Sequence, residues 1–212
     1  MYSSLTRAKF EILSADEVIR IHDASLDVLA NTGVQVDDVE TRKMLGEAGA
    51  QVAKSNGIIK IPESLVHEAL KKAPKEFLLY GRDGVKPLRL GQWDSYFTTG
   101  GYATYVYDLW TGSRREVTSC DLADAVRLAD ALPSCDLIAN IPAARDVPQA
   151  TLDRHQWAIG LTHTRKHVLS EARGYDSVKD AIAMTAAIAG STDALKKRPI
   201  ITFDATTISP LT

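Results

Sequence analysis

The chain has 212 residues, with 25 lysines and arginines against 27 aspartates and glutamates, and its formal net charge at pH 7 is −2. Hydrophobic residues make up 45% and charged residues 25% of the sequence, which is typical of a globular protein with a sizeable core. This charge balance excludes the strong positive field that attracts nucleic acid or an anionic membrane surface. We therefore expect no nucleic acid and no membrane among its partners.

The two cysteines, Cys120 and Cys135, lack the CxxC spacing and the second pair of ligands that a zinc site requires. We expect both to be reduced thiols, as in a cytoplasmic protein. The amino terminus shows no apolar signal-peptide region, and the longest mostly apolar stretch, at residues 181–189, is too short to span a bilayer. The predicted location is therefore the cytoplasm.

The first 95 residues predict a small segment of mixed helices and strands. Ser14 and Glu17 have the spacing of a helix capping box, and Val18, Ile21 and Val28 form an apolar stripe at helical spacing after it. Further elements are expected at residues 34–36, 37–45, 58–61, 63–72, 77–80 and 88–90. Because these elements do not follow the repeat of a parallel sheet, we predict that residues 1–95 form an N-terminal α+β cap.

Residues 96–212 begin with a β-rich segment and continue with alternating strands and helices. Strand-forming residues on both sides of Gly112 predict a β-hairpin near residues 104–118, and Thr118 with Asp121 predicts the start of a helix. Strands are expected at residues 96–99, 136–140, 167–170 and 199–204, and helices at residues 119–132, 149–162 and 177–189. Such alternation is typical of parallel β-α units.

The predicted fold class is α/β, with the N-terminal α+β cap followed by the first part of a (β/α)8 TIM-type barrel. A single barrel of this type needs about 250 residues. We therefore expect residues 96–212 to supply about the first half of a barrel that is incomplete in this chain. In such barrels the catalytic groups lie at the carboxyl ends of the strands and in the loops that follow them.

Several separated motifs carry a resemblance to one known family. They are residues 13–33, 77–83, 107–115 with 118–121, 198–200 and 209–211. Across nearly the whole chain they resemble the trimethylamine methyltransferase family. The resemblance implies a β/α barrel enzyme that moves a methyl group from a methylated amine to the Co(I) corrinoid of a partner protein. It also implies that this chain corresponds to the N-terminal half of longer family members.

The resemblance carries expectations about cofactor and partners. The corrinoid (cobalamin) is expected to be carried by the cognate corrinoid protein, with none bound tightly by this chain. A homo-oligomer is also expected. The family divides into enzymes that use pyrrolysine to act on trimethylamine and a larger branch without it that includes glycine betaine enzymes. The pyrrolysine position lies beyond residue 212, and we favour the second branch and a quaternary amine such as glycine betaine as methyl donor.

An aromatic-rich segment at residues 96–110 suits the binding of a methylated ammonium group, which offers no N–H donors. Aromatic faces attract such cations, with about 0.5–2 kcal/mol for each cation–π contact. We predict that Tyr102 and Tyr105 line the substrate pocket. The alternative is that these side chains pack the cap onto the barrel as ordinary hairpin aromatics.

Four polar residues fall at or just beyond the expected carboxyl ends of successive strands. They are Asn140, Glu171, Asp204 and Thr206. We predict that Glu171 or Asp204 balances the ammonium charge of the substrate, and that Asn140 or Thr206 donates a hydrogen bond to its carboxylate. The alternative is that these residues cap the following helices or pair with nearby arginines. No catalytic residue is assigned.

The histidines do not predict a metal site. His163 and His167 are four residues apart, but they lie on both sides of a helix-to-strand junction and have no third ligand beside them. The segment from Asp153 to Ala158 faintly resembles the cobalamin-binding motif DxHxxG. It has alanine in the glycine position and lies in an expected helix, so we interpret the match as coincidence.

Two alternatives to an active methyltransferase stay open. The first is a non-catalytic half-barrel fragment or subunit that binds a partner protein. The second is a different barrel enzyme, such as a lyase or aldolase, that uses the same polar residues at the strand ends. Its Schiff-base version is disfavoured because Lys166 precedes its strand instead of following it.

Overall fold

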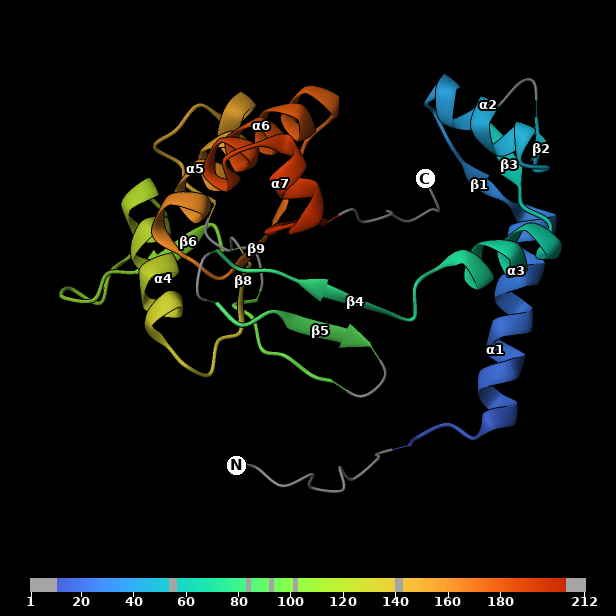
Figure 1. The fold of residues 1–212 in the computed structure, drawn as a ribbon, viewed down its shortest axis with the longest axis horizontal. Coiled ribbons are helices and arrows are strands. Elements are labelled where there is room, and N and C mark those ends of the chain that lie inside the picture. Colours follow the sequence, from blue (N-terminus) through green and yellow to red (C-terminus); the bar gives the residue numbers. More distant parts are fainter. Residues whose placement is uncertain are drawn as a thin grey trace. The chain divides into compact units, whose positions relative to one another are not determined.

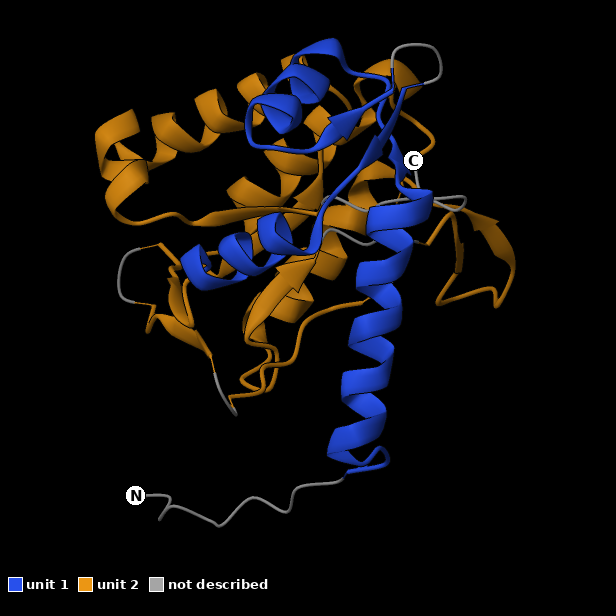
Figure 2. Cartoon of the chain, turned by 90° about the vertical axis from the view of Figure 1, so that its right-hand side faces the viewer, with its two compact units in different colours: residues 1–73, 207–212 blue, residues 74–206 orange. Residues whose placement is uncertain are grey.

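The computed structural model describes residues 11–53, 57–82, 85–91, 94–100, 103–139 and 143–204. These residues form two compact units, one containing the residues up to Ala73 and the other the residues from Pro74 onward (Figure 2). The boundary predicted from the sequence lies later, at residues 95/96, so two strands before it belong to the second compact unit.

The first unit begins with α1 (Ala15–Asp27), which continues into a short π-helical turn (Val28–Thr32). The predicted capping box is present, because Ser14 Oγ accepts from the amide of Glu17 and the Glu17 carboxylate accepts from the amide of Ser14. Gly33 ends the turn with φ of 82°, which favours glycine. A Cβ atom at Gly33 would lie 2.5 Å from the carbonyl oxygen of Ile59, so this position also needs glycine for close approach.

A three-stranded antiparallel sheet completes this unit together with two more helices. The sheet has the order β1–β3–β2. Its strands are β1 (Val34–Gln35), β2 (Gln51–Val52) and β3 (Ile58–Lys60), and the helices are α2 (Val39–Glu47) and α3 (Glu63–Lys72). The Asp38 side chain caps α2 by accepting from the amide of Thr41. Ile59 in the central strand is fully buried and forms the centre of the small core.

The second unit contains two antiparallel strand pairs before its helices begin. The pairs are β4 (Glu76–Leu79) with β5 (Leu88–Gly91), and β6 (Tyr105–Tyr107) with β7 (Arg114–Glu116). The second pair is the predicted hairpin. The segment after β4 is tied to the rest of the unit, because the amide of Tyr80 donates to the carbonyl of Pro199 at 3.2 Å.

Three parallel strands form the sheet at the centre of the second unit. They are β8 (Leu137–Ala139), β9 (His167–Glu171) and β10 (Ile201–Asp204), and each pairs with the next one along the chain. The predicted strand at residues 96–99 is reduced to a parallel bridge between Thr98 and Leu137 on the free side of β8. The parallel segments therefore lie side by side in chain order.

Helices connect these strands and pack against the sheet. They are α4 (Ser119–Ala131), a 3-10 turn (Gln149–Thr151), α5 (Leu152–His163), α6 (Tyr175–Ala189) and α7 (Thr192–Lys197). Figure 1 shows α5, α6 and α7 next to one another, and α4 also contacts α5. Ile138 packs against α4, while Val168 and Ile201 pack with Trp157 of α5 and Ala181 of α6. One face of the sheet is thus covered by this helical layer.

The predicted α/β class is confirmed by this mixture of helices and strands. Helix α7 was not predicted from the sequence. No helix among the residues described is long and apolar enough to cross a membrane.

Candidate functional site

The face of the parallel sheet opposite the helices carries the predicted polar residues of β9 and β10. Val168, Ile201 and Phe203 contact the helical layer, so the alternating positions of the same strands point to the other side. These positions are His167, Leu169 and Glu171 in β9, and Thr202 and Asp204 in β10. Polar groups therefore lie along the face opposite the helices, with two carboxylates at its carboxyl edge.

Glu171 and Asp204 are brought together by the register of the two strands. They are paired Cα partners at the last positions of β9 and β10, and adjacent strands lie about 4.8 Å apart. Both residues are exposed. A cation bound at this edge would be attracted by both negative charges. The sequence predicted that each of these residues lies at the end of a strand, and their role in substrate binding stays a prediction.

The loop after β9 is held in place by Asp153, a residue of α5 with 1% of its surface exposed. Its carboxylate accepts from the amide of Arg173 at 2.8 Å and from the hydroxyl of Ser177. Burial pushes the pKa of Asp153 upward, but hydrogen bonds from Ser177 and from the amides of Arg173 and Arg154, with the charge of Arg154, outweigh it. The pKa of this carboxyl is therefore below its ordinary value, and it stays ionised.

Trp157 fixes the end of β9 directly. Its indole Nε1 donates to the carbonyl oxygen of Glu171 at 2.8 Å, and its ring is fully buried against Phe203 at a centroid distance of 5.2 Å. Asp153, Trp157 and Ser177 together define where the Glu171 main chain lies. This role was not predicted from the sequence, although a carboxylate beside the buried positions of α5 was a signal of it.

His167 lies at the opposite end of β9, on the same face as Glu171. Its Nδ1 is 2.9 Å from the carbonyl oxygen of Tyr80, and its Nε2 is 2.8 Å from the hydroxyl of Thr202. A carbonyl can only accept, so Nδ1 carries the proton and Nε2 accepts from Thr202. Burial lowers the pKa of His167 against the opposing effect of the Tyr80 carbonyl, and the ring is neutral near pH 7.

The other predicted site residues are not brought to this edge by the described structure. Tyr105 lies in β6, on a separate two-stranded sheet, and the guanidinium of Arg114 lies 3.7 Å from the centre of its ring. One aromatic face of Tyr105 is thus already in contact with a cation of the protein. Tyr102, Asn140 and Thr206 lie outside the described residues, so their predicted roles stay predictions.

Within the described ranges, no three His, Cys, Asp or Glu side chains are grouped so that they could hold a metal ion. His163 Nδ1 lies 2.9 Å from the carbonyl oxygen of Ile159 in its own helix, and His167 has the partners given above. The segment that faintly resembled a cobalamin motif lies in α5. Its Asp153 is buried and accepts a hydrogen bond from the loop after β9. Its geometry does not fit a loop that would hold a corrinoid.

Comparison with known proteins decides the family. The family model for trimethylamine methyltransferase (MTTB) matches residues 2–212. The chain belongs to this family. The trimethylamine methyltransferase MttB of Desulfitobacterium hafniense is 30% identical over 198 residues, covering 93% of this chain and 40% of that protein. MttB1 of Methanosarcina acetivorans is 31% identical over 219 residues, covering 99% of this chain and 43% of that protein.

The same family includes a relative with a different named substrate. The glycine betaine methyltransferase of Desulfitobacterium hafniense is 24% identical over 204 residues, covering 96% of this chain and 42% of that protein. The chain therefore spans about two fifths of the length of these relatives. The predicted resemblance is confirmed, and the match lies with part of each longer protein.

Proposed function

We propose that the polypeptide carrying this chain transfers a methyl group from a methylated amine to the Co(I) corrinoid of a partner protein. The observation that carries this proposal is the family match over residues 2–212, because relatives in that family are named for trimethylamine and for glycine betaine. The two neighbouring carboxylates at the ends of β9 and β10 add support from the structure. Self-association of the chain stays a prediction from the resemblance.

The proposed fold of the second unit is the first part of a (β/α)8 barrel. Its parallel segments follow one another in chain order, and its connecting helices pack against one face of the sheet. This arrangement supports the barrel proposal, because helices cover both faces in a doubly wound sheet. In a barrel the face opposite the helices, with Glu171 and Asp204 at its carboxyl edge, would become the interior wall below the active site.

The chemistry asks little acid–base work of the protein. When the donor is a quaternary amine, the carbon–nitrogen bond breaks with its electron pair left on nitrogen, so the leaving tertiary amine is neutral and needs no proton. The corrinoid supplies the electron pair that forms the new bond to the methyl carbon. The protein must hold the cation and direct one methyl group, and electrostatic stabilisation by fixed charges is suited to that task.

Glu171 and Asp204 are proposed to bind the ammonium group of the donor. Their combined negative charge attracts a cation, and the buried contacts of Asp153 and Trp157 keep the Glu171 main chain in position. The same charge repels a carboxylate, so a donor such as glycine betaine would direct its carboxylate away from this pair. The roles predicted for Asn140 and Thr206 would then apply at the other end of the donor.

Binding measurements test this assignment of the two carboxylates. Glycine betaine and trimethylamine are titrated by calorimetry into the natural polypeptide that carries this chain, and into its Glu171→Gln and Asp204→Asn variants. Losing one charge next to the ammonium is expected to weaken binding about tenfold. Asp193→Asn, an exposed substitution in α7, is the matched control and is expected to bind as the unaltered protein does. Unchanged affinity in both site variants would remove the carboxylate pair from the substrate site.

A further inference from the structure

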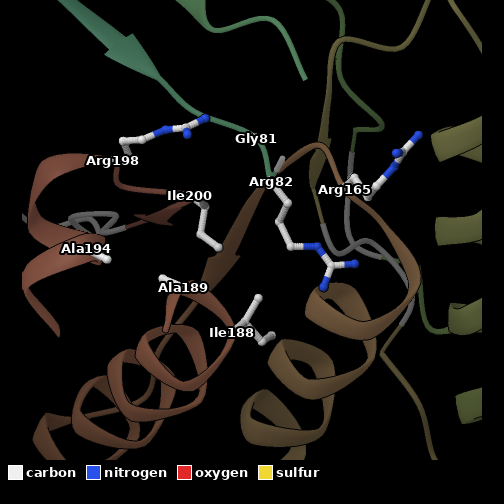
Figure 3. Close-up of a pocket in the computed structure, with 8 residues that line it drawn as sticks. All are labelled: Gly81, Arg82, Arg165, Ile188, Ala189, Ala194, Arg198 and Ile200. Atoms are coloured by element: carbon white, nitrogen blue, oxygen red, sulfur yellow. The ribbon is translucent and has the colours of Figure 1, made fainter. Parts of the chain in front are cut away.

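A cavity of about 430 Å³ lies in the second unit at the amino ends of β9 and β10, opposite to the ends that carry Glu171 and Asp204. Figure 3 shows it between the segment after β4, the entries to β9 and β10, and the end of α6. Three of the residues that line it are arginines, Arg82, Arg165 and Arg198. Its volume is within the range of small-molecule sites.

The wall of the cavity is formed by a main-chain segment with fixed contacts. The amide of Arg82 donates to the carbonyl of Arg165 at 2.7 Å, and the amide of Tyr80 donates to the carbonyl of Pro199 at 3.2 Å. At Gly81, a Cβ atom would lie 2.7 Å from the carbonyl oxygen of Arg165, so no side chain fits there. Arg82 is therefore held at the cavity by its own backbone.

Among the ion pairs of the described residues, none involves Arg82, Arg165 or Arg198. The Arg198 guanidinium lies 5.5 Å from the centre of the Tyr80 ring, a cation–π distance. Such a contact with a ring is not a hydrogen bond, so the N–H groups of Arg198 can still donate to an anion.

The third arginine contributes less. In Figure 3 the Arg165 side chain points away from those of Arg82 and Arg198. Asp130, which accepts from the main-chain amide of Arg165 at 3.1 Å, also lies close enough for its carboxylate to interact with the Arg165 charge. The positive charge available inside the cavity therefore comes from Arg82 and Arg198.

Apolar side chains lie between these two arginines. Ile188 and Ala189 come from the last turn of α6, and Ile200 comes from the entry to β10. The carboxyl end of a helix carries about half a negative charge, which is smaller than the two positive charges beside it. A ligand with only an anionic group would leave the apolar surface exposed, and a neutral ligand would leave the arginines unpaired.

We propose that this cavity binds a small organic anion, a phosphate ester or carboxylate with an apolar portion, at the end of the barrel opposite the methyl-transfer site. The anionic group contacts the guanidinium of Arg82 or that of Arg198, and the apolar portion lies against Ile188, Ala189 and Ile200. The site is independent of the identity of the methyl donor. Arg165→Gln is expected to affect binding less than substitution of the arginine that makes this contact.

Calorimetric titration of the chain with phenyl phosphate, phenylacetate and benzyl alcohol tests this proposal. Saturable binding is expected for at least one of the two anions. No saturable binding is expected for the neutral benzyl alcohol at the same concentrations. Tighter binding of phenyl phosphate would identify a phosphate ester as the natural class of ligand, and tighter binding of phenylacetate would identify a carboxylate. Arg82→Gln or Arg198→Gln, whichever removes the guanidinium that contacts the anion, should weaken anion binding about tenfold.

The matched control is Arg127→Gln on α4, an exposed arginine that does not line the cavity. It is expected to bind both anions with unchanged affinity. Melting temperatures confirm that each variant is folded, and Arg82→Lys, which keeps the charge, should retain part of the affinity. Absence of saturable binding by both anions would overturn the proposal, as would binding that is unchanged in both Arg82→Gln and Arg198→Gln.

Discussion

The two compact units differ in how their helices are stabilised. In the first unit the described buried hydrophobic residues are Leu26, Ala50 and Ile59, whereas the second unit has two clusters that join helices to the parallel sheet. The apolar stripe predicted for α1 illustrates the contrast, because Val18 and Ile21 are 53% and 55% exposed. Capping signals and close main-chain approach define the first unit, and a buried core with hydrogen bonds to side chains defines the second.

The largest effect is expected at the centre of the second unit. Trp157→Ala removes a fully buried ring that contacts Phe203 and the Glu171 carbonyl, and should lower the free energy of unfolding of that unit by about 4 kcal/mol. Trp110→Ala is the matched control, since Trp110 is 90% exposed and should cost less than about 0.5 kcal/mol. Urea unfolding followed by circular dichroism measures both. Equal costs would show that the buried cluster does not stabilise the unit.

Asp153→Asn should have the next largest effect. The amide side chain cannot accept from all the donors that the carboxylate satisfies, and a buried donor left unpaired costs free energy, here about 3 kcal/mol in total. Tryptophan fluorescence during urea unfolding reports on the second unit, which contains all three tryptophans of the chain. Asp124→Asn, at an exposed position of α4, is the control. Hydrogen exchange at Arg173 should increase in the Asp153 variant alone.

Gly33→Ala tests the first unit, with an expected cost of about 2 kcal/mol. The substitution adds both the strain of a positive φ and a Cβ atom 2.5 Å from the Ile59 carbonyl oxygen. Gly49→Ala in the same unit adds the strain at φ of 108° but meets no atom within 4 Å, so it should cost about 1 kcal/mol. Hydrogen exchange of the β1–β3 amides compares the two. The close-approach argument fails if both variants lose the same stability.

The smallest expected effect is a pH dependence of the second unit's free energy of unfolding, caused by His167. Its folded pKa lies below the ordinary value of 6.5, so the unfolded chain binds the proton more readily. The stabilisation is complete above pH 6.5 and is lost as the pH falls below it. Unfolding free energies measured between pH 7 and pH 5 should therefore decrease for the unaltered protein and decrease less for His167→Gln. A steeper decrease of the unfolding free energy in the His167→Gln variant would contradict this prediction.

Local signals predicted most elements of the fold. The helix at residues 63–72 has the bounds expected from its sequence, and the capping boxes at Ser14 and Thr118 are both present. The six-residue helix α7 was missed because it is too short to show a repeating apolar pattern. The exposure of the α1 stripe was also not predictable, since periodicity indicates an apolar face but not what covers it.

The candidate site was predictable where it depended on topology. Parallel strands place their carboxyl ends at one edge, so Glu171 and Asp204 were expected to be neighbours and are register partners. The contact of Arg114 with the Tyr105 ring and the role of Asp153 depend on side-chain directions that the linear order of residues does not contain. The alternation of residues in β6 predicted on which face of the strand Tyr105 lies, but it did not predict that the Arg114 guanidinium contacts its ring.

Methyl transfer is the direct test of the proposed function. The natural polypeptide that carries this chain is mixed with cobalamin reduced to Co(I), and with glycine betaine, trimethylamine or no amine, while the visible absorbance of Co(I) is followed. We predict that Co(I) is consumed with one of the two amines and that the demethylated amine appears in equal amount. A folded protein that consumes no Co(I) with either amine would contradict the proposal.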